Sequence, residues 1–184
     1  MIIVLAVVIA AAVAALICGG SLESLAATRF RLTWLIVAGL VLQLAVDLWL
    51  SQWLPAETAT AGIVASNGAV AAFLLANHRL PGMALAGAGL VLNLLVIAAN
   101  GAMPVSQRAA RIAGLPRDAL SQPGIKHEVL GNDTALSPLA DVIPLPGTGQ
   151  VISAGDIVLA AGIGRLVYAR TRAGRKKQQE TLDS

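Results

Sequence analysis

Five long apolar runs dominate the sequence and restrict what the chain can fold into. Each approaches the roughly 20 residues that a helix needs to cross the hydrocarbon core of a bilayer. Lipid offers no hydrogen-bond partner to open backbone groups, and the runs do not alternate as the strands of a closed barrel would, so we expect helices. The predicted spans lie near residues 2–17, 32–54, 58–77, 83–100 and 151–168.

The composition indicates that lipid is the solvent of this chain. Of its 184 residues, 57% are hydrophobic and 12% are charged, with a mean hydropathy of +0.76, whereas soluble domains carry about 25% charged residues. A chain of this length has room for one compact domain. We therefore predict an all-α fold in which residues 1–184 form a single polytopic transmembrane bundle of the cell's inner (plasma) membrane, with the lipid bilayer as its partner.

Basic residues predict the orientation of the spans. With a cytoplasmic C-terminus and an outer N-terminus, nine basic residues are inside and four are outside, in agreement with the positive-inside tendency. Residues 169–184 then form a basic, solvated cytoplasmic tail that faces anionic headgroups. The inner residues are Arg29, Arg31, Arg79, Arg165, Arg170, Arg172, Arg175, Lys176 and Lys177, and the outer ones are Arg108, Arg111, Arg117 and Lys126.

Residues 101–150 form a long extracytoplasmic loop, which we expect to be an ordered cap because loops of this length are rarely idle connections. Its first part contains the signals of a short helix, which Ser106 can cap and which Gly114 and Pro116 end after Arg111.

The second part of the loop leads into the last span. Ser137 and Pro138 are typical of an N-cap followed by a proline at the first helical position, with Asp141 in the next turn. The Pro- and Gly-rich stretch from Pro144 to Gly149 then breaks the chain before the last apolar run.

Polar side chains inside the spans are the first candidates for a functional site, because a charge at this depth costs about 2.5–3.5 kcal/mol on insertion scales. Asp47 follows Gln43 by one turn, so both share a helix face. Together with Asn67, Asn93 and Asn100, they can line an outward-facing polar cavity beneath the loop. The alternative is that the amides are interhelical hydrogen-bond partners and that small residues serve close packing. Those small residues are Gly68, Gly82, Ala86, Gly87 and Gly89.

Two aspartates flank the turn in LADVIPLPGTGQVISAGDIVL, residues 139–159. Asp156 opens the last apolar run, and its spacing from Ser153 is that of a capping box, so it can simply satisfy the start of a helix. The turn also lets the chain reverse, which would bring Asp141 over the same helix end. We therefore predict that the Asp141 and Asp156 carboxylates share a polar pocket near the outer membrane face, with Ser153 and His127 as further candidate binding residues.

Several kinds of site are not indicated. The chain has no Gly-rich phosphate loop and no Walker pattern, so we expect no nucleotide. One cysteine and two histidines lack the spacing of metal ligands, so we expect no metal and no cofactor. The pI of about 9.6 reflects the basic tail rather than binding to nucleic acid. A membrane-protein partner is the remaining expectation.

Three stretches resemble an uncharacterised bacterial membrane-protein family, the domain of unknown function numbered 5317. They are NGAMPVS at residues 100–106, KHEVL at residues 126–130, and LADVIPLP followed by SAGDIVLAAGI. The resemblance covers most of the chain, is clearest over residues 100–163 and carries no known activity.

A more distant resemblance connects the two aspartates to lipoprotein signal peptidases of the aspartyl type. Asp141 within ADVI, and Asp156 within SAGD with Gly162 six residues further on, are similar to the two carboxylate segments of that family. The resemblance implies a dyad in which one carboxylate activates water and a protonated partner donates to the scissile carbonyl. The chain departs from that family in having Ser153 in place of an asparagine, no Asn-Xaa-Xaa-Asp-Arg motif, and five predicted spans instead of four.

Three functions thus stay open. We expect a small multi-pass membrane protein that serves as a scaffold or assembly partner without chemistry. The alternatives are an aspartyl hydrolase that uses Asp141 and Asp156, and a transport or proton-relay subunit that uses Asp47.

Overall fold

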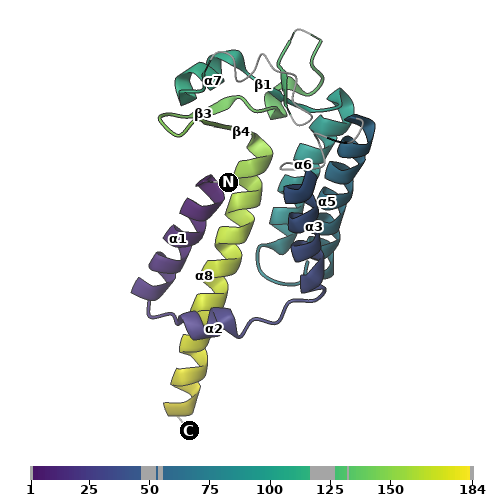
Figure 1. Cartoon of the computed structure of the whole chain (residues 1–184). Coiled ribbons are helices and arrows are strands. Elements are labelled where there is room, and N and C mark those ends of the chain that lie inside the picture. The colour runs from purple at the N-terminus through teal and green to yellow at the C-terminus, as the bar shows by residue number, and fades with distance from the viewer. Residues whose placement is uncertain (1, 47–52, 54–55, 117–126, 132, 183–184) are drawn as a thin grey trace.

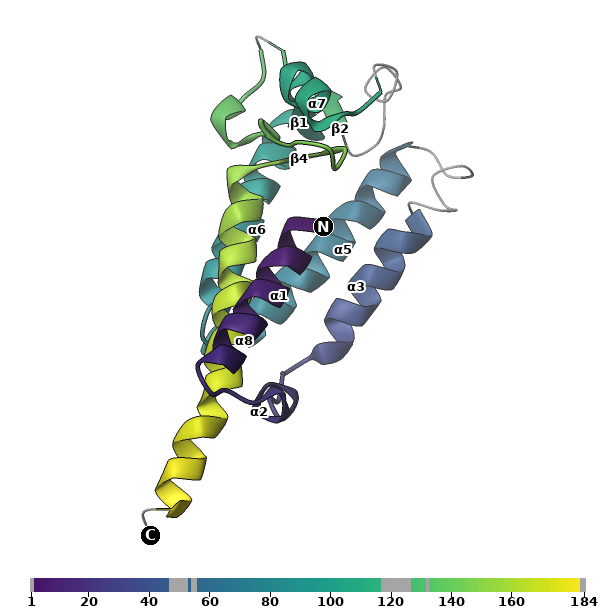
Figure 2. The same cartoon turned by 90° about the vertical axis from the view of Figure 1, so that its left-hand side faces the viewer.

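The computed structural model describes residues 2–46, 53, 56–116, 127–131 and 133–182. The described chain is mostly helical, as predicted. Long helices lie lengthwise beside one another, and the short helix α2 (Leu22–Ala26) lies at one end of them (Figures 1 and 2). The long helices are α1 (Ile2–Ile17), α3 (Thr33–Ala45), α5 (Ala56–Ala76), α6 (Met83–Asn100) and α8 (Ala154–Leu182).

Helices α6 and α8 approach closely because glycines line their interface. A Cβ added to Gly89 on α6 would overlap the backbone of Leu159, and one added to Gly162 on α8 would overlap the backbone of Ala86. Small residues of this kind let helix backbones come together in lipid. The predicted packing role is therefore confirmed for Gly82, Ala86 and Gly89, whereas a Cβ on Gly87 would meet nothing nearer than Leu74 Cβ at 4.0 Å.

An apolar core joins α5, α6 and α8. Its buried members are Phe73, Leu74, Met83, Ala86, Leu90 and Leu166. Phe30, from the link between α2 and α3, packs on Phe73 with the ring centroids 5.9 Å apart. This contact ties the α2–α3 link to the end of α5.

One helix of the described chain, α6, is long and apolar enough to cross a membrane. Only 28% of that segment is buried inside the molecule. Shorter apolar stretches occupy Ile3–Ile17 in α1, Thr33–Ala45 in α3 and Ala61–Ala76 in α5.

The segment between α6 and α8 forms a cap at the end of the helices opposite the C-terminus (Figure 1). Strand β1 (Met103–Val105) pairs in parallel with β2 (His127–Val129), and strand β3 (Ile143–Leu145) pairs antiparallel with β4 (Gln150–Ile152). The cap also contains α7 (Gln107–Ala113) and the short 3-10 helix η3 (Ser137–Leu139). These strands were not predicted.

The predicted short helix after Ser106 is confirmed as α7. The Ser106 side chain accepts a hydrogen bond from the Ala109 amide at 3.3 Å, and Gly114 ends the helix with a φ of 89°. The prediction at Ser137 was wrong in part, because the turn starts after Leu136 and is only one 3-10 turn long. Asp141 lies beyond it, in a bridge to Val105, and not in a helical turn.

Helices α1 and α6 have the predicted bounds, but the last helix does not. Val151 and Ile152 pair with β3 instead of opening a helix, so α8 begins at Ala154. The helix then continues to Leu182 through most of the segment predicted as a solvated tail. Within that segment Thr171 is fully buried, and its carbonyl accepts a hydrogen bond of 2.7 Å from the Ser21 amide.

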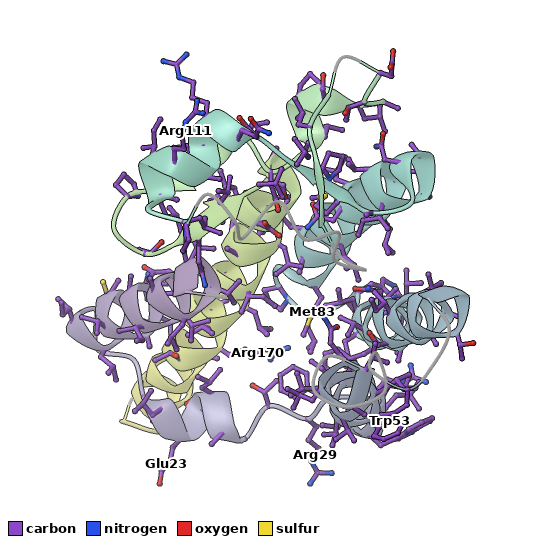
Figure 3. The ribbon with its side chains drawn as sticks, turned by 45° about the horizontal axis from the view of Figure 1, so that its top comes forward. Glu23, Arg29, Trp53, Met83, Arg111 and Arg170 are labelled. Carbon is purple, nitrogen blue, oxygen red and sulfur yellow. The ribbon has the colours of Figure 1, made fainter. Side chains whose placement is uncertain are left out.

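Arg170, predicted as part of the solvated tail, faces the helices instead. Figure 3 shows its side chain extending from α8 toward Met83. Its Nε is buried without a hydrogen-bond partner in the part of the chain that the structure describes.

Candidate functional site

Asp156 and Ser153 form the predicted capping box at the start of α8. The Ser153 amide donates to Asp156 Oδ2 at 3.1 Å, and the Asp156 amide donates to Ser153 Oγ at 3.0 Å. This reciprocal pair satisfies two backbone amides that have no partner inside the helix. It explains why the helix begins after Ser153 and places the Asp156 carboxylate in its first turn.

Asn93 of α6 completes the environment of Asp156 from the neighbouring helix. Its amide Nδ2 donates to Asp156 Oδ1 at 2.8 Å, and its Oδ1 accepts from the Ser153 hydroxyl at 2.9 Å. A Cβ on Gly155 would overlap Asn93 Oδ1, so this arrangement depends on a glycine at that position. Both Asp156 oxygens thus accept hydrogen bonds, one from Asn93 and one from the Ser153 amide.

Asp141 is held in the cap by its backbone. Its amide donates to the Pro104 carbonyl at 3.0 Å, and its carbonyl accepts from the Ser106 amide at 2.9 Å. The segment NGAMPVS therefore lies between β2 on one side and Asp141 on the other. The side chain is only 6% exposed, and its Oδ1 is buried without a hydrogen-bond partner among the described residues.

The electrostatic environment of Asp141 favours the protonated carboxyl. Burial, and secondarily the negative charge of Asp156, raise the pKa of Asp141 from its ordinary value of 3.8 to about 7. A buried acid close to an ionised partner behaves in this way because both effects disfavour a second negative charge. Near neutral pH, the Asp141 carboxyl group can therefore hold a proton.

The buried position of Asp141 disagrees with a purely capping role for residues 139–159. That role would leave the Asp141 side chain in solvent, whereas the structure buries it and couples it to Asp156. Asp156 caps α8, and its negative charge also contributes to the raised pKa of Asp141.

The remaining predicted site residues belong to separate sets of hydrogen bonds. Gln43 accepts from the Ser66 hydroxyl at 3.1 Å between α3 and α5, and Asn67 donates to Ile63 of its own helix at 2.9 Å. Asn100 joins the end of α6 to the cap. Its side chain donates to the Ala135 carbonyl at 3.0 Å and accepts from the Ala135 amide at 2.9 Å.

The last two predicted site residues are His127 and Asp47. His127 lies in β2, where its backbone pairs with Met103. Asp47 falls outside the described residues, so the relay function stays a prediction. Among the residues that are described, no group of three or more His, Cys, Asp or Glu side chains could hold a metal ion.

Sequence reasoning missed the residues that position Asp141. Pro104 and Ser106 hold it through their backbone groups, and backbone pairing between distant segments leaves little trace in side-chain patterns. The available signal was the quoted NGAMPVS stretch itself, which contains both residues and ends at the cap of α7.

The fold and these contacts define a mostly helical protein with one helix long and apolar enough to cross a membrane, a small β cap that buries Asp141, and a half-buried Asp156 at the start of α8. A family model described as a family of unknown function, DUF5317, matches residues 27–168, and the chain belongs to that family. No curated protein and no solved structure matches the chain.

Proposed function

We propose that this protein is an aspartyl hydrolase embedded in the bacterial plasma membrane, with Asp141 and Asp156 as its acid and base at the outer membrane surface. The observation that carries the proposal is the burial of Asp141 beside the charge of Asp156, with one carboxyl oxygen unpartnered in the described chain. A structural carboxyl group at this depth would ordinarily have its hydrogen bonds satisfied.

The proposed reaction assigns one step to each carboxyl group. Asp156 takes a proton from a water molecule, which attacks the scissile carbonyl carbon, while Asp141 donates its proton to the carbonyl oxygen. When the tetrahedral intermediate collapses, the new hydroxyl returns a proton to Asp141 and Asp156 protonates the leaving group. Asn93 and Ser153 act as positioning residues, because their hydrogen bonds orient the Asp156 carboxylate.

The proposal includes a five-span arrangement in which α1, α3, α5, α6 and α8 cross the membrane. It is supported by large apolar side chains that point away from the molecule along α1 and α3. Leu5 and Ile9 are 61% and 54% exposed, and Val41 is 59% exposed. Water-soluble proteins seldom expose contiguous apolar surface of this extent, whereas lipid accommodates it.

The proposed orientation places the cap outside and the C-terminus in the cytoplasm. It is supported by the distribution of basic residues along the helices. The link that carries Arg29 and Arg31, and the α5–α6 turn that carries Arg79, lie at the end remote from the cap (Figure 1). Basic residues retained on one side favour that side as cytoplasmic.

Substitution of each aspartate tests the hydrolase directly. Cells that lack their own copy would express the wild-type chain, Asp141→Asn, Asp156→Asn, or the control Asp133→Asn, which alters an exposed carboxylate of the cap. The termini of their membrane proteins are then compared by mass spectrometry. Wild type and the control should generate new termini, and each dyad variant should reduce them by about a hundredfold or more, the usual contribution of general acid–base catalysis.

Two results would contradict the hydrolase. One is a set of termini that is unchanged in Asp156→Asn cells. The other is identical termini with and without the wild-type chain, which would leave the scaffold or assembly function in its place.

A further inference from the structure

A basic pocket lies at the end of the helices remote from the cap. It has a volume of about 220 Å³ and lies between the α2–α3 link and the α5–α6 turn. Arg29, Arg31, Arg79 and His78 contribute to its lining, with Asn77 and Leu80. None of its lining residues is acidic.

Asn77 builds this pocket by joining the two segments. Its side chain is 4% exposed, accepts a hydrogen bond from the Arg31 amide at 2.8 Å and donates to the Arg31 carbonyl at 2.8 Å. Asn77 also donates to the Phe73 carbonyl of α5 at 2.8 Å. A buried side chain that satisfies both backbone groups of Arg31 fixes the link to the helix end, so the pocket is formed before any ligand binds.

The charges of the pocket are not neutralised within the described chain. Arg29, Arg31 and Arg79 are all exposed, and no salt bridge joins them to a described carboxylate. Figure 3 shows the Arg29 side chain extending away from the helices. Three arginines that line one pocket carry like charges, and an anion that binds among them reduces their mutual repulsion. Phosphate is the anion whose geometry suits guanidinium groups best.

His78 adds a polar group of a different kind. Its Nδ1 lies 2.7 Å from the Leu75 carbonyl, which can only accept, so Nδ1 carries the hydrogen of that bond. The Nε2 atom is then available to accept a hydrogen bond from a hydroxyl group or a protonated phosphate oxygen.

An exposed apolar stripe leads from the pocket along α3. Trp34, Val37 and Val41 are 64%, 56% and 59% exposed, and their spacing places them on one face of the helix. The stripe begins three residues after Arg31, a lining residue of the pocket. A ligand with a phosphate group and hydrocarbon chains would satisfy both features at once.

We propose that this pocket binds the phosphate of an anionic phospholipid headgroup, whose acyl chains lie along the exposed face of α3. The proposal goes beyond the hydrolase and uses only its membrane placement, since the pocket would face the inner leaflet. Arginines near a membrane surface are attracted to anionic lipids in general. This proposal is more specific, because a preformed pocket would bind one lipid at one site.

Native mass spectrometry of the purified full chain tests this inference. The protein in nonionic detergent is titrated with phosphatidylglycerol, with phosphatidylcholine, and with inorganic phosphate. The pocket variant Arg29→Gln/Arg31→Gln/Arg79→Gln is compared with a control that removes three exposed charges elsewhere, Arg108→Gln/Arg111→Gln/Arg165→Gln. One phosphatidylglycerol should bind to the wild type and to the control, with affinity for the pocket variant on the order of a hundredfold weaker.

Other outcomes would overturn the proposal. Equal phosphatidylglycerol binding by the pocket variant would show that the arginines do not form the site. Binding of inorganic phosphate with the same affinity as the lipid would show that the occupant is a free anion. If the triple variant does not fold, as judged by circular dichroism, Arg29→Gln and Arg79→Gln alone should each weaken binding about fivefold. Because the readout is binding, Asp141→Asn should bind lipid like the wild type even if no hydrolase exists.

Discussion

Asn93 of α6 and Asp156 of α8 are joined by a hydrogen bond of 2.8 Å that crosses the interface of the two helices. The same asparagine accepts from Ser153, so one amide side chain satisfies both members of the capping box. The close approach of the two backbones at Gly155 is what brings Asn93 within reach. Glycine packing, helix capping and the proposed dyad therefore depend on the same contact.

The substitution Asn93→Ala should destabilise the protein. It leaves Asp156 Oδ1 and the Ser153 hydroxyl without their partners, at an expected cost of about 1–3 kcal/mol. The matched control is Asn67→Ala, which removes a hydrogen bond within one helix and should cost less than about 1 kcal/mol. Thermal unfolding in detergent measures the stability of both variants. Equal losses of stability would show that the hydrogen bonds between α6 and α8 contribute no more than one within a single helix.

The substitution Gly155→Ala should also destabilise the protein. An added Cβ overlaps Asn93 Oδ1, so the asparagine must move or the helices must separate, at a cost of about 1–3 kcal/mol. The control Gly68→Ala adds a methyl group that meets nothing within 4 Å and should be neutral or stabilising by up to about 1 kcal/mol. A melting temperature for Gly155→Ala at or above that of the wild type would contradict the packing described for α6 and α8.

The stability of the protein should fall as pH rises between about 5 and 8. The pKa of Asp141 is about 7 in the folded state and near 3.8 when unfolded, so the folded state binds more protons between these values. Stability from this group is fully present below the unfolded pKa and is lost as the pH rises to the folded pKa, and about 2–3 kcal/mol of this loss falls between about pH 5 and 8. In Asp141→Asn this contribution should be absent, so its melting temperature should exceed that of the wild type at pH 8. Parallel pH profiles for the two proteins would contradict the raised pKa.

Several features of this fold were predictable because they depend on local sequence. The bounds of α1 and α6 follow from apolar runs with sharp ends, and α7 follows from Ser106 and Gly114. The capping box at Ser153 was predictable for the same reason. The start of α8 was misplaced because Val151 and Ile152 are apolar enough for a helix, yet pair with β3 instead.

The central features of both sites could not be predicted, because they arise from contacts between distant segments. Asp141 is buried through its backbone pairing with Pro104 and Ser106, and nothing near Asp141 in the sequence encodes that pairing. The basic pocket depends on Asn77, which binds the backbone of Arg31 across 46 residues of sequence. The sequence predicted an excess of basic residues on one side of the membrane. Only the tertiary structure shows that Arg29, Arg31 and Arg79 line one pocket.

The proposed topology predicts that reporters fused after Ser106 and after Thr171 lie on opposite sides of the membrane. The first position is in the cap, and the second is in the lower part of α8 (Figure 1). A periplasmic alkaline phosphatase should be active only in the first fusion, and a fluorescent protein that folds only in the cytoplasm should be active only in the second. The same side for both would contradict the membrane placement on which the lipid pocket depends.

Infrared spectroscopy of the Asp141 carboxyl group tests the acid–base pair most directly. Protein with ¹³C-labelled aspartate is titrated in lipid, and the protonated carboxyl band that disappears in Asp141→Asn is followed with pH. We expect this band to be lost at a pH of about 7 in the wild type, and at a lower pH in Asp156→Asn, where burial still acts but the neighbouring charge is gone. A band that titrates at the same pH with and without the Asp156 charge, or that is already lost near the ordinary pKa of 3.8, would show that the two aspartates are not a pair.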